Sequence, residues 1–171
     1  MKKLLLGALL LLSTLSFSQN NLKLNYEKDV MNDKEYIFLS ERLLCSEDGK
    51  IGFSITPMFK IIGGVISYNS TSVKSVGIGH CMENDEIIFL FEDDTKLVLK
   101  SWQKFNCDGK SYFDLRGNEL VNLNKRIKAI RLTNGYKYES YTYILKTENE
   151  KNYFVYVNQL LVSQKYEIKN K

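Results

Sequence analysis

The chain is poor in several residue types, and each shortage narrows what it can be. Its 171 residues include one proline, one histidine, one tryptophan and three cysteines. With a single proline, no Gly/Ser-rich linker, no repeat and plentiful Ile, Leu, Val, Phe and Tyr, the sequence is not that of a disordered protein. Because His80 is the only histidine and no His, Cys or Asp cluster has ligand spacing, no metal site and no cofactor are predicted.

An excess of charge is also missing. The chain carries 24 Lys and Arg residues against 20 Asp and Glu residues. Removal of Lys2 and Lys3 with the N-terminal segment leaves 22 basic and 20 acidic residues, a net charge of +2. A balance so close to neutrality predicts no nucleic-acid partner and no polybasic contact with a membrane.

What the chain does have is an N-terminal segment typical of secretion. Lys2 and Lys3 precede an apolar run from Leu4 to Leu12, and residues 13–18 are mostly polar and small. The run is shorter than the roughly 20 apolar residues of a membrane-spanning helix. We therefore predict a signal peptide over residues 1–18, cleaved after Ser18, and one domain over residues 19–171 without a permanent membrane anchor. The alternative is an N-terminal membrane helix that is never cleaved.

Beyond this segment, alternation of apolar and polar residues predicts a mainly β domain. The clearest feature is a hairpin over residues 86–100, and Pro57 is expected to end the strand that begins at Ile51. The remaining strands are expected over residues 22–26, 35–39, 59–68, 112–115, 136–146 and 152–157. So many short strands indicate an antiparallel two-layer domain, sandwich-like or barrel-like.

One segment has helical spacing instead. Apolar residues recur at steps of three and four from Leu120 to Ile130, and Asn118 is suited to an N-cap. We predict one short helix over residues 118–126, leading into a strand that runs through Leu132. The C-terminal tail from Ser163 is polar and is expected to be frayed.

The three cysteines predict one disulfide. Cys81 precedes the hairpin and Cys107 follows it, and because a hairpin brings its two ends together, these residues are the expected pair. Cys45 follows Leu43-Leu44 and is expected to be a small buried residue. A bridge that includes Cys45, or three unpaired thiols, are the alternatives.

Two surfaces are candidates for binding. The first is tyrosine-rich: Tyr136 and Tyr138 share one face of a predicted strand, and Tyr141 and Tyr143 share the other. Such rings can stack on a sugar or a peptide, and the alternative is that they only pack. The second is a basic region with Arg126 and Arg131 as its candidate contacts, for which a solvated helix face is the alternative; it consists of Arg116, Lys125, Arg126, Lys128 and Arg131.

No catalytic residue is predicted. Neighbours on a strand point to opposite faces, so His80 and Cys81 cannot act on one atom. A pair formed in space by Cys45 and His80 has no support in the sequence. The acidic run Glu92-Asp93-Asp94 lacks the spacing of a calcium loop and is read as a solvated turn.

The order of these features resembles small secreted β-rich proteins of unknown function from Gram-negative bacteria. The features are the signal segment, a Cys–hairpin–Cys unit from Cys81 to Cys107, a short helix and the Ile130-Arg131-Leu132 strand. The resemblance implies no activity. We expect a secreted or periplasmic binding domain at the cell envelope, not an enzyme, whose partner is an envelope protein or a glycan. A secreted hydrolase with an unrecognised site and a structural or assembly subunit are the alternatives.

Overall fold

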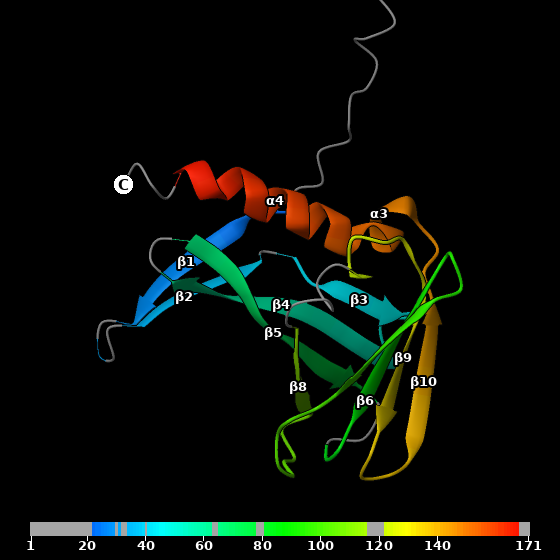
Figure 1. The fold of residues 1–171 in the computed structure, drawn as a ribbon. Helices are drawn as coiled ribbons and strands as arrows, with labels where there is room; N and C mark the ends of the chain where they lie inside the picture. The colour runs from blue at the N-terminus through cyan, green and yellow to red at the C-terminus, as the bar shows by residue number, and fades with distance from the viewer. Residues whose placement is uncertain are drawn as a thin grey trace, which may run out of the picture.

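The computed structural model of the chain describes residues 22–29, 31, 34–39, 41–62, 65–77, 81–115 and 122–167 (Figure 1). The predicted signal peptide and His80 lie outside these residues. Helices α3 (Glu148–Lys151) and α4 (Tyr153–Glu167) follow the last strand. The strands are β1 (Leu24–Asp29), β2 (Lys34–Leu39), β3 (Leu43–Ser46), β4 (Gly52–Ile62), β5 (Val65–Val76), β6 (Glu86–Phe91), β7 (Lys96–Lys100), β8 (Lys110–Asp114), β9 (Ile127–Asn134) and β10 (Glu139–Ile144).

The strands form two antiparallel sheets, which confirms the predicted fold class. The first has six strands in the order β1-β2-β4-β5-β8, with β3 also paired to β4. The second has four strands in the order β10-β9-β6-β7. An isolated bridge between Ser101 and Phe113 joins the two sheets on one side. The arrangement is sandwich-like and is not a closed barrel.

The core lies between the two sheets. In the predicted hairpin, Ile87, Phe89 and Phe91 of β6 are buried, and Leu97 and Leu99 of β7 are buried beside them. The six-stranded sheet contributes an equally apolar inner face, which includes Phe53, Ile55, Val73 and Phe113. Each such side chain stabilises the fold by roughly 1.5–3 kcal/mol on burial, so the alternating pattern is also the main energetic signal.

Pro57 does not end a strand, contrary to the prediction. Strand β4 continues through it to Ile62, with a register shift against β5 between Met58 and Phe59. On its other side, β4 pairs with β3 up to Ile55 and with β2 from Met58 onward. Pro57 therefore lies where β4 changes partners, a position at which a missing N–H is tolerated.

The predicted strand over residues 152–157 is wrong, because this segment belongs to helix α4. Its buried residues Tyr153, Val157 and Leu161 are spaced by four, so they share one helix face. Phe154 packs edge-on against Phe89 of β6 with ring centroids 5.7 Å apart. Many residues of this segment are strand-forming types, so the helical spacing was not recognised in the sequence. Helix α4 lies across one end of the sandwich (Figure 1) and ends at Glu167, within the segment predicted to be frayed.

The sequence just before α4 also contains a helix signal, a capping box at the start of α3. Thr147 caps α3, its hydroxyl accepts from the N–H of Glu150 at 3.2 Å, and the Glu150 carboxylate accepts from the N–H of Thr147 at 2.9 Å. This is a capping box of the form Thr-x-x-Glu. The helix predicted over residues 118–126 is described only from Asn122 onward, where a single helical residue leads into a turn. In the described part of the chain, no helix is long and apolar enough to cross a membrane.

Candidate functional site

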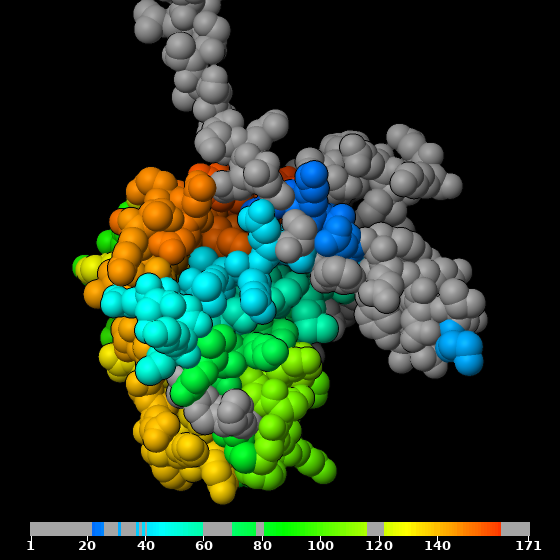
Figure 2. Space-filling view, turned by 180° about the vertical axis from the view of Figure 1, so that it is seen from behind, coloured from blue at the N-terminus to red at the C-terminus, as the bar shows by residue number. Residues whose placement is uncertain are grey.

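Four aromatic side chains reach solvent at one end of the sandwich. The exposed fraction is 62% for Trp102, 49% for Phe105, 50% for Tyr136 and 87% for Tyr138. The first two follow β7 and the other two form the turn between β9 and β10; both segments lie at the lower end of the molecule in Figures 1 and 2. Among the other residues whose side chains the structure describes, the exposed large apolar ones are not aromatic: Met31, Leu44, Ile51, Val98 and Ile144. We call the surface formed by Trp102, Phe105, Tyr112, Tyr136 and Tyr138 the aromatic end.

The rings of the aromatic end contact one another across different elements. Phe105 and Tyr136 have centroids 5.2 Å apart, which joins the segment after β7 to the β9–β10 turn. Trp102 lies 5.7 Å from Tyr112 of β8. The backbone N–H of Tyr112 also donates to the side-chain oxygen of Gln103 at 2.7 Å. The segment that carries the Trp102 and Phe105 rings is therefore held along β8.

The predicted disulfide fixes the end of the segment that carries Trp102 and Phe105. Cys81 and Cys107 are bridged, and Cys45 is the unpaired, fully buried cysteine, as expected. Next to the bridge, Met82 and Asn106 exchange two backbone hydrogen bonds of 2.7 and 3.1 Å. The covalent bond and the two hydrogen bonds fix the same two chain segments together.

The buried side chain of Asp85 connects the segments that carry the aromatic end. Asp85 is fully buried, and one of its oxygens accepts from the backbone N–H of Gly135 at 2.9 Å while the other accepts from the hydroxyl of Ser111. Its own backbone N–H donates to the hydroxyl of Ser101 at 2.9 Å, and its C=O accepts from the N–H of Ser101 at 2.8 Å. One residue thus connects the β9–β10 turn, β8 and the start of the Trp102 segment. Hydrogen bonds to a charged group contribute about 1.5–3 kcal/mol each.

A buried amide organises the turn that carries the tyrosines. Asn134 accepts on its side-chain oxygen from the N–H groups of Tyr136 and Lys137, at 2.9 and 3.0 Å. Its amide donates to the C=O of Cys81 at 2.9 Å, so the turn is also joined to the disulfide. The following residue must be Gly135, because a Cβ there would overlap the backbone oxygens behind it.

The turn corrects the predicted strand over residues 136–146. Strand β10 begins only at Glu139, and Tyr138 has a left-handed φ of 59°. Tyr136 and Tyr138 are exposed because they lie in the turn, not because they share a strand face. In β10 itself, Tyr141 is half-buried and Tyr143 is buried. Tyr136 and Tyr138 thus differ in exposure from Tyr143 because of the turn, and not because of alternation along one strand.

The inner tyrosines serve the fold. The ring of Tyr141 lies edge-on to Phe53, with centroids 5.9 Å apart. The hydroxyl of Tyr143 donates to the carboxylate of Glu150 at 3.0 Å. Burial, together with the nearby Glu150 carboxylate, raises the pKa of Tyr143 to about 12. These two residues connect β10 to β4 and to α3, so they are removed from the candidate binding surface.

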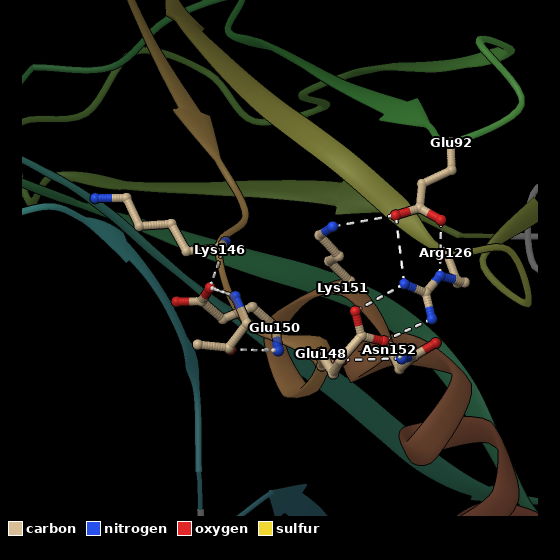
Figure 3. Close-up of polar contacts among 8 residues, drawn as sticks. Glu92, Arg126, Lys146, Glu148, Glu150, Lys151 and Asn152 are labelled. Carbon is tan, nitrogen blue, oxygen red and sulfur yellow. Dashed lines mark hydrogen bonds and ion pairs between the residues drawn. The ribbon is translucent and has the colours of Figure 1, made fainter.

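The candidate arginine contacts are engaged or distant from the rings. The guanidinium of Arg126 contacts Glu92 at 2.8 Å and Glu148 at 2.6 Å (Figure 3). Arg131 lies on the outer face of the four-stranded sheet and donates to the hydroxyl of Thr142 at 2.9 Å. Arg116 lies outside the described residues. Arg126 and Arg131 do not belong to the aromatic end, and their predicted role in binding has no geometric support here.

The basic region instead belongs to an ionic cluster around the β6–β7 turn. Lys151 contacts Glu92 at 3.2 Å, Lys125 contacts Asp93 at 2.7 Å and Lys128 contacts Asp94 at 2.9 Å. Hydrogen bonds from Lys125 and Thr95 lower the pKa of Asp93 to about 2. We call these paired charges, together with Arg126 and its two carboxylate partners, the ionic cluster. It consists of Glu92, Asp93, Asp94, Lys125, Arg126, Lys128, Glu148 and Lys151.

The surroundings of Asp85, Cys45 and Glu150 decide how these three ionisable groups can react. Both oxygens of Asp85 accept hydrogen bonds in a buried site. Burial raises the pKa of the Cys45 thiol, which opposes formation of a nucleophilic thiolate. Partial burial would raise the pKa of Glu150, but backbone hydrogen bonds from Thr147 and Lys146 leave it lowered overall. Among the described residues, no three His, Cys, Asp or Glu side chains could hold a metal ion.

The described pockets lie away from the aromatic rings. One open pocket of about 210 Å³ lies between β3 and the start of α4, with Leu43, Glu150 and Tyr153 in its lining. A hollow of about 130 Å³ lies on the outer face of the four-stranded sheet. Both are smaller than the roughly 300–1,000 Å³ typical of small-molecule sites. Neither of these two pockets is lined by a residue of the aromatic end.

Sequence reasoning missed several residues of this surface. Trp102, Phe105 and Tyr112 were not grouped with the tyrosines, although Trp102 and Phe105 come just before Cys107. That proximity to the predicted disulfide was the available signal. Asp85 carries no local signal, because its partners Ser111 and Gly135 are distant in sequence. Asn134-Gly135 is a local turn signal, but the bond from Asn134 to Cys81 is not predictable from it.

Comparisons with known proteins give no relative for this chain. No protein-family model matches it, no curated protein matches it and no solved structure matches it. The functional argument therefore rests on the geometry of the aromatic end.

Proposed function

We propose that the chain is a secreted or periplasmic binding domain, without catalytic activity of its own, whose aromatic end binds a glycan of the cell envelope. The observation that carries this proposal is the position of the rings. Among the residues whose side chains the structure describes, the exposed aromatic ones are Trp102, Phe105, Tyr136 and Tyr138, and all four lie at one end.

The rings are held in place before any ligand arrives. Asp85, Asn134 and the Cys81–Cys107 bridge fix the two segments that carry the rings. A surface that is already ordered loses little conformational entropy on binding, so its contacts contribute more fully to affinity. A fold that needed these rings only for packing would bury them, since exposed rings add little to stability.

A glycan is the ligand class that such a surface fits best. Sugar rings have flat C–H faces that pack on exposed aromatic rings, and their hydroxyls bond to polar side chains at the rim. Lys104 and Lys137 are exposed next to the rings in sequence and can supply these bonds. Several exposed rings that lie side by side also suit a polymer, whose successive sugars can each contact a ring.

The disulfide supports an address outside the cytoplasm. Structural disulfides form and persist in oxidising compartments and are rare in reducing ones. The bridge thus agrees with the expected cleavage after Ser18 and export of residues 19–171. The disulfide and the β-rich fold also agree with the expected resemblance to small secreted bacterial β-rich proteins.

The test uses Trp102, which is the only tryptophan of the chain. Its emission is monitored while the purified exported protein is titrated with soluble peptidoglycan fragments and, separately, with the polysaccharide part of lipopolysaccharide. Stacking of a sugar on the exposed ring is expected to shift the emission to shorter wavelength with a saturable dependence on glycan concentration. Tyr138→Ala is expected to weaken binding about fivefold, since one aromatic contact contributes on the order of 1 kcal/mol.

A matched control separates the rings from general surface hydrophobicity. Val98 is 48% exposed on β7 and lies outside the aromatic end, so Val98→Ala is expected to leave the titration unchanged. The proposal fails if neither glycan changes the emission of Trp102, or if Tyr138→Ala and Val98→Ala bind as tightly as the unaltered protein.

A further inference from the structure

Strand β10 is the outermost strand of its sheet, and its outer edge is open. It pairs with β9 only, and the N–H of Leu145 donates to the C=O of Lys128 at 3.1 Å just beyond the strand. In an antiparallel ladder, alternate residues point their N–H and C=O groups to the same side. Ser140, Thr142 and Ile144 therefore point these groups away from β9. All three residues are exposed, and no described strand pairs with them.

This edge lacks the features that normally protect an exposed strand. Natural edges carry charges, proline or a bulge, or they are very short. Residues 140–144 of β10 read Ser-Tyr-Thr-Tyr-Ile, with no charge and no proline, and their register against β9 is unbroken. An uncharged segment of strand formers with an open edge readily pairs with another chain.

The other described edges differ from β10. Strand β3 is only four residues long. Strand β7 carries Lys96 and Lys100 and is bridged to β8 through Ser101. Strand β1 includes Glu27 and Lys28. Strand β8 carries Lys110 and Asp114. Among these described edges, β10 has the longest uncharged run, residues 140–144, which points to a partner that covers it.

The sequence of β10 is complementary to itself. A partner must meet the outward-pointing residues as hydrogen-bonded pairs. An antiparallel two-fold contact centred on Thr142 places Thr142 opposite Thr142 of the second copy, and Ser140 opposite Ile144. In the same register Tyr141 lies opposite Tyr143 of the second copy, and Glu139 lies opposite the uncharged Leu145. Thr–Thr and aromatic pairs across strands are favourable, and no like charges lie directly opposite each other within β10.

We propose that two copies of this chain associate through β10 in this register, so that two four-stranded sheets become one continuous sheet. The contact is isologous, as expected for a two-fold dimer. The side chain of Ile144, which is 66% exposed in one copy, comes to lie beside the β10 residues of the other. An antiparallel contact also directs the two aromatic ends to opposite ends of the dimer. If the aromatic end binds glycan as proposed above, the dimer is suited to connect two separate glycan chains.

A cysteine scan of β10 tests the register directly. A hydrogen-bonded pair has Cα atoms about 5.5 Å apart, within the range of a disulfide. Thr142→Cys is therefore expected to give a covalent dimer on a non-reducing gel after incubation with oxidised glutathione, which accepts the two electrons of the thiols. Ser140→Cys is the matched control: two such residues are about four positions apart across the two-fold, roughly 13 Å, and are not expected to cross-link. The native cysteines do not interfere, because two are bridged and Cys45 is buried.

Sedimentation of a dilution series measures the association itself. The unaltered protein is expected to dissociate reversibly, and Thr142→Lys is expected to weaken dimerisation tenfold or more, because two like charges then meet at the two-fold axis. Val98→Lys adds the same charge to the same sheet face, but on β7 at the opposite edge of the sheet, and should dimerise normally. A monomer at every concentration, or equal cross-linking by Thr142→Cys and Ser140→Cys, would overturn the proposal. The Trp102 titration is independent of these outcomes, so dimer and glycan can fail separately.

Discussion

The two ends of the four-stranded sheet expose very different chemistry. Strand β6 begins beside Asp85 at the aromatic end and finishes beside Glu92 in the ionic cluster. At the first end the exposed groups are rings, and the polar groups that hold them are buried. At the second end the exposed groups are charges, and they hold one another, as Arg126 does with Glu92 and Glu148.

This contrast explains why charge density was a poor guide to the functional surface. In the ionic cluster each acidic group has a basic partner within 3.2 Å, so little charge is left to attract a ligand. At the aromatic end the support and the exposed surface are separate. Removing a partner from the ionic cluster leaves a solvated charge, whereas removing one below the rings leaves a buried polar group without a bond. The second loss is the more costly.

The largest effect is therefore expected at Asp85. Asp85→Ala leaves the hydroxyl of Ser111 and the N–H of Gly135 without their acceptor in a buried site. We expect a loss of about 3 kcal/mol in the free energy of unfolding, measured by urea denaturation. The glycan titration should weaken as well, because the β9–β10 turn loses its support.

Asp108→Ala provides the matched control at the same end. Asp108 is exposed, and its carboxylate accepts from the N–H of Lys110 at 3.1 Å. Its loss should cost less than about 1 kcal/mol. Equal losses for the two substitutions would mean that burial of Asp85 does not organise the aromatic end.

The next largest effect is expected at Gly135. The backbone of the β9–β10 turn passes so close to residues 83–84 that an added methyl group would overlap the carbonyl oxygens of Glu83 and Asn84. Backbone atoms cannot move aside as a flexible side chain does, so Gly135→Ala is expected to destabilise by about 2 kcal/mol.

Gly49→Ala separates this steric effect from backbone strain. Gly49 has a φ of +72° but nothing within 4 Å of the added carbon. Its substitution should cost about 1 kcal/mol from the left-handed conformation alone. Thermal or urea unfolding of both variants decides the comparison. If Gly49→Ala is the more damaging, the close approach at Gly135 does not constrain the turn.

Much of the fold could be predicted from the sequence, because its strands alternate. Phe89 and Leu97 are buried as their period of two requires, and the Cys81–Cys107 bridge follows from the hairpin between them. Helix α4 was missed because Tyr153 and Val157 belong to strand-forming types, although the Thr147 capping box marked a helix start nearby.

The candidate site was harder to predict, because it depends on contacts between segments distant in sequence. The tyrosine-rich segment drew attention to Tyr136 and Tyr138, but alternation assigned them to a strand. The side chains of Asn134 and Asp85 that create the turn instead bond across the fold: the Asn134 amide donates to the C=O of Cys81, and the Asp85 carboxylate accepts from the hydroxyl of Ser111. No local pattern encodes such long-range hydrogen bonds, which is why the support of the aromatic end appeared only in the structure.

The smallest effect is expected in the ionic cluster. Hydrogen bonds from Arg126 and Lys151 lower the pKa of Glu92, and Lys125 holds the pKa of Asp93 near 2. A carboxyl whose pKa is lowered on folding stabilises the protein above its unfolded pKa of about 4, and this stabilisation is lost as the pH falls through the folded value. The cluster should therefore contribute fully from pH 7 to about pH 5 and lose its contribution between roughly pH 4 and pH 2.

Salt distinguishes this contribution from that of the aromatic end. The charges of the cluster are exposed, so at 1 M NaCl, where the Debye length is about 3 Å, their attraction is screened. Of Asp85→Ala, Gly135→Ala and Glu92→Gln, the last should lower the urea midpoint the least at pH 7. This shift should disappear at high salt. The exposed Glu41, which is outside the cluster, supplies the control Glu41→Gln, for which no shift is expected in either condition. The shift caused by Asp85→Ala should persist at high salt, because its hydrogen bonds are buried. A salt-independent effect of Glu92→Gln would show that the cluster stabilises the fold by packing, and the distinction between the two ends would then no longer hold.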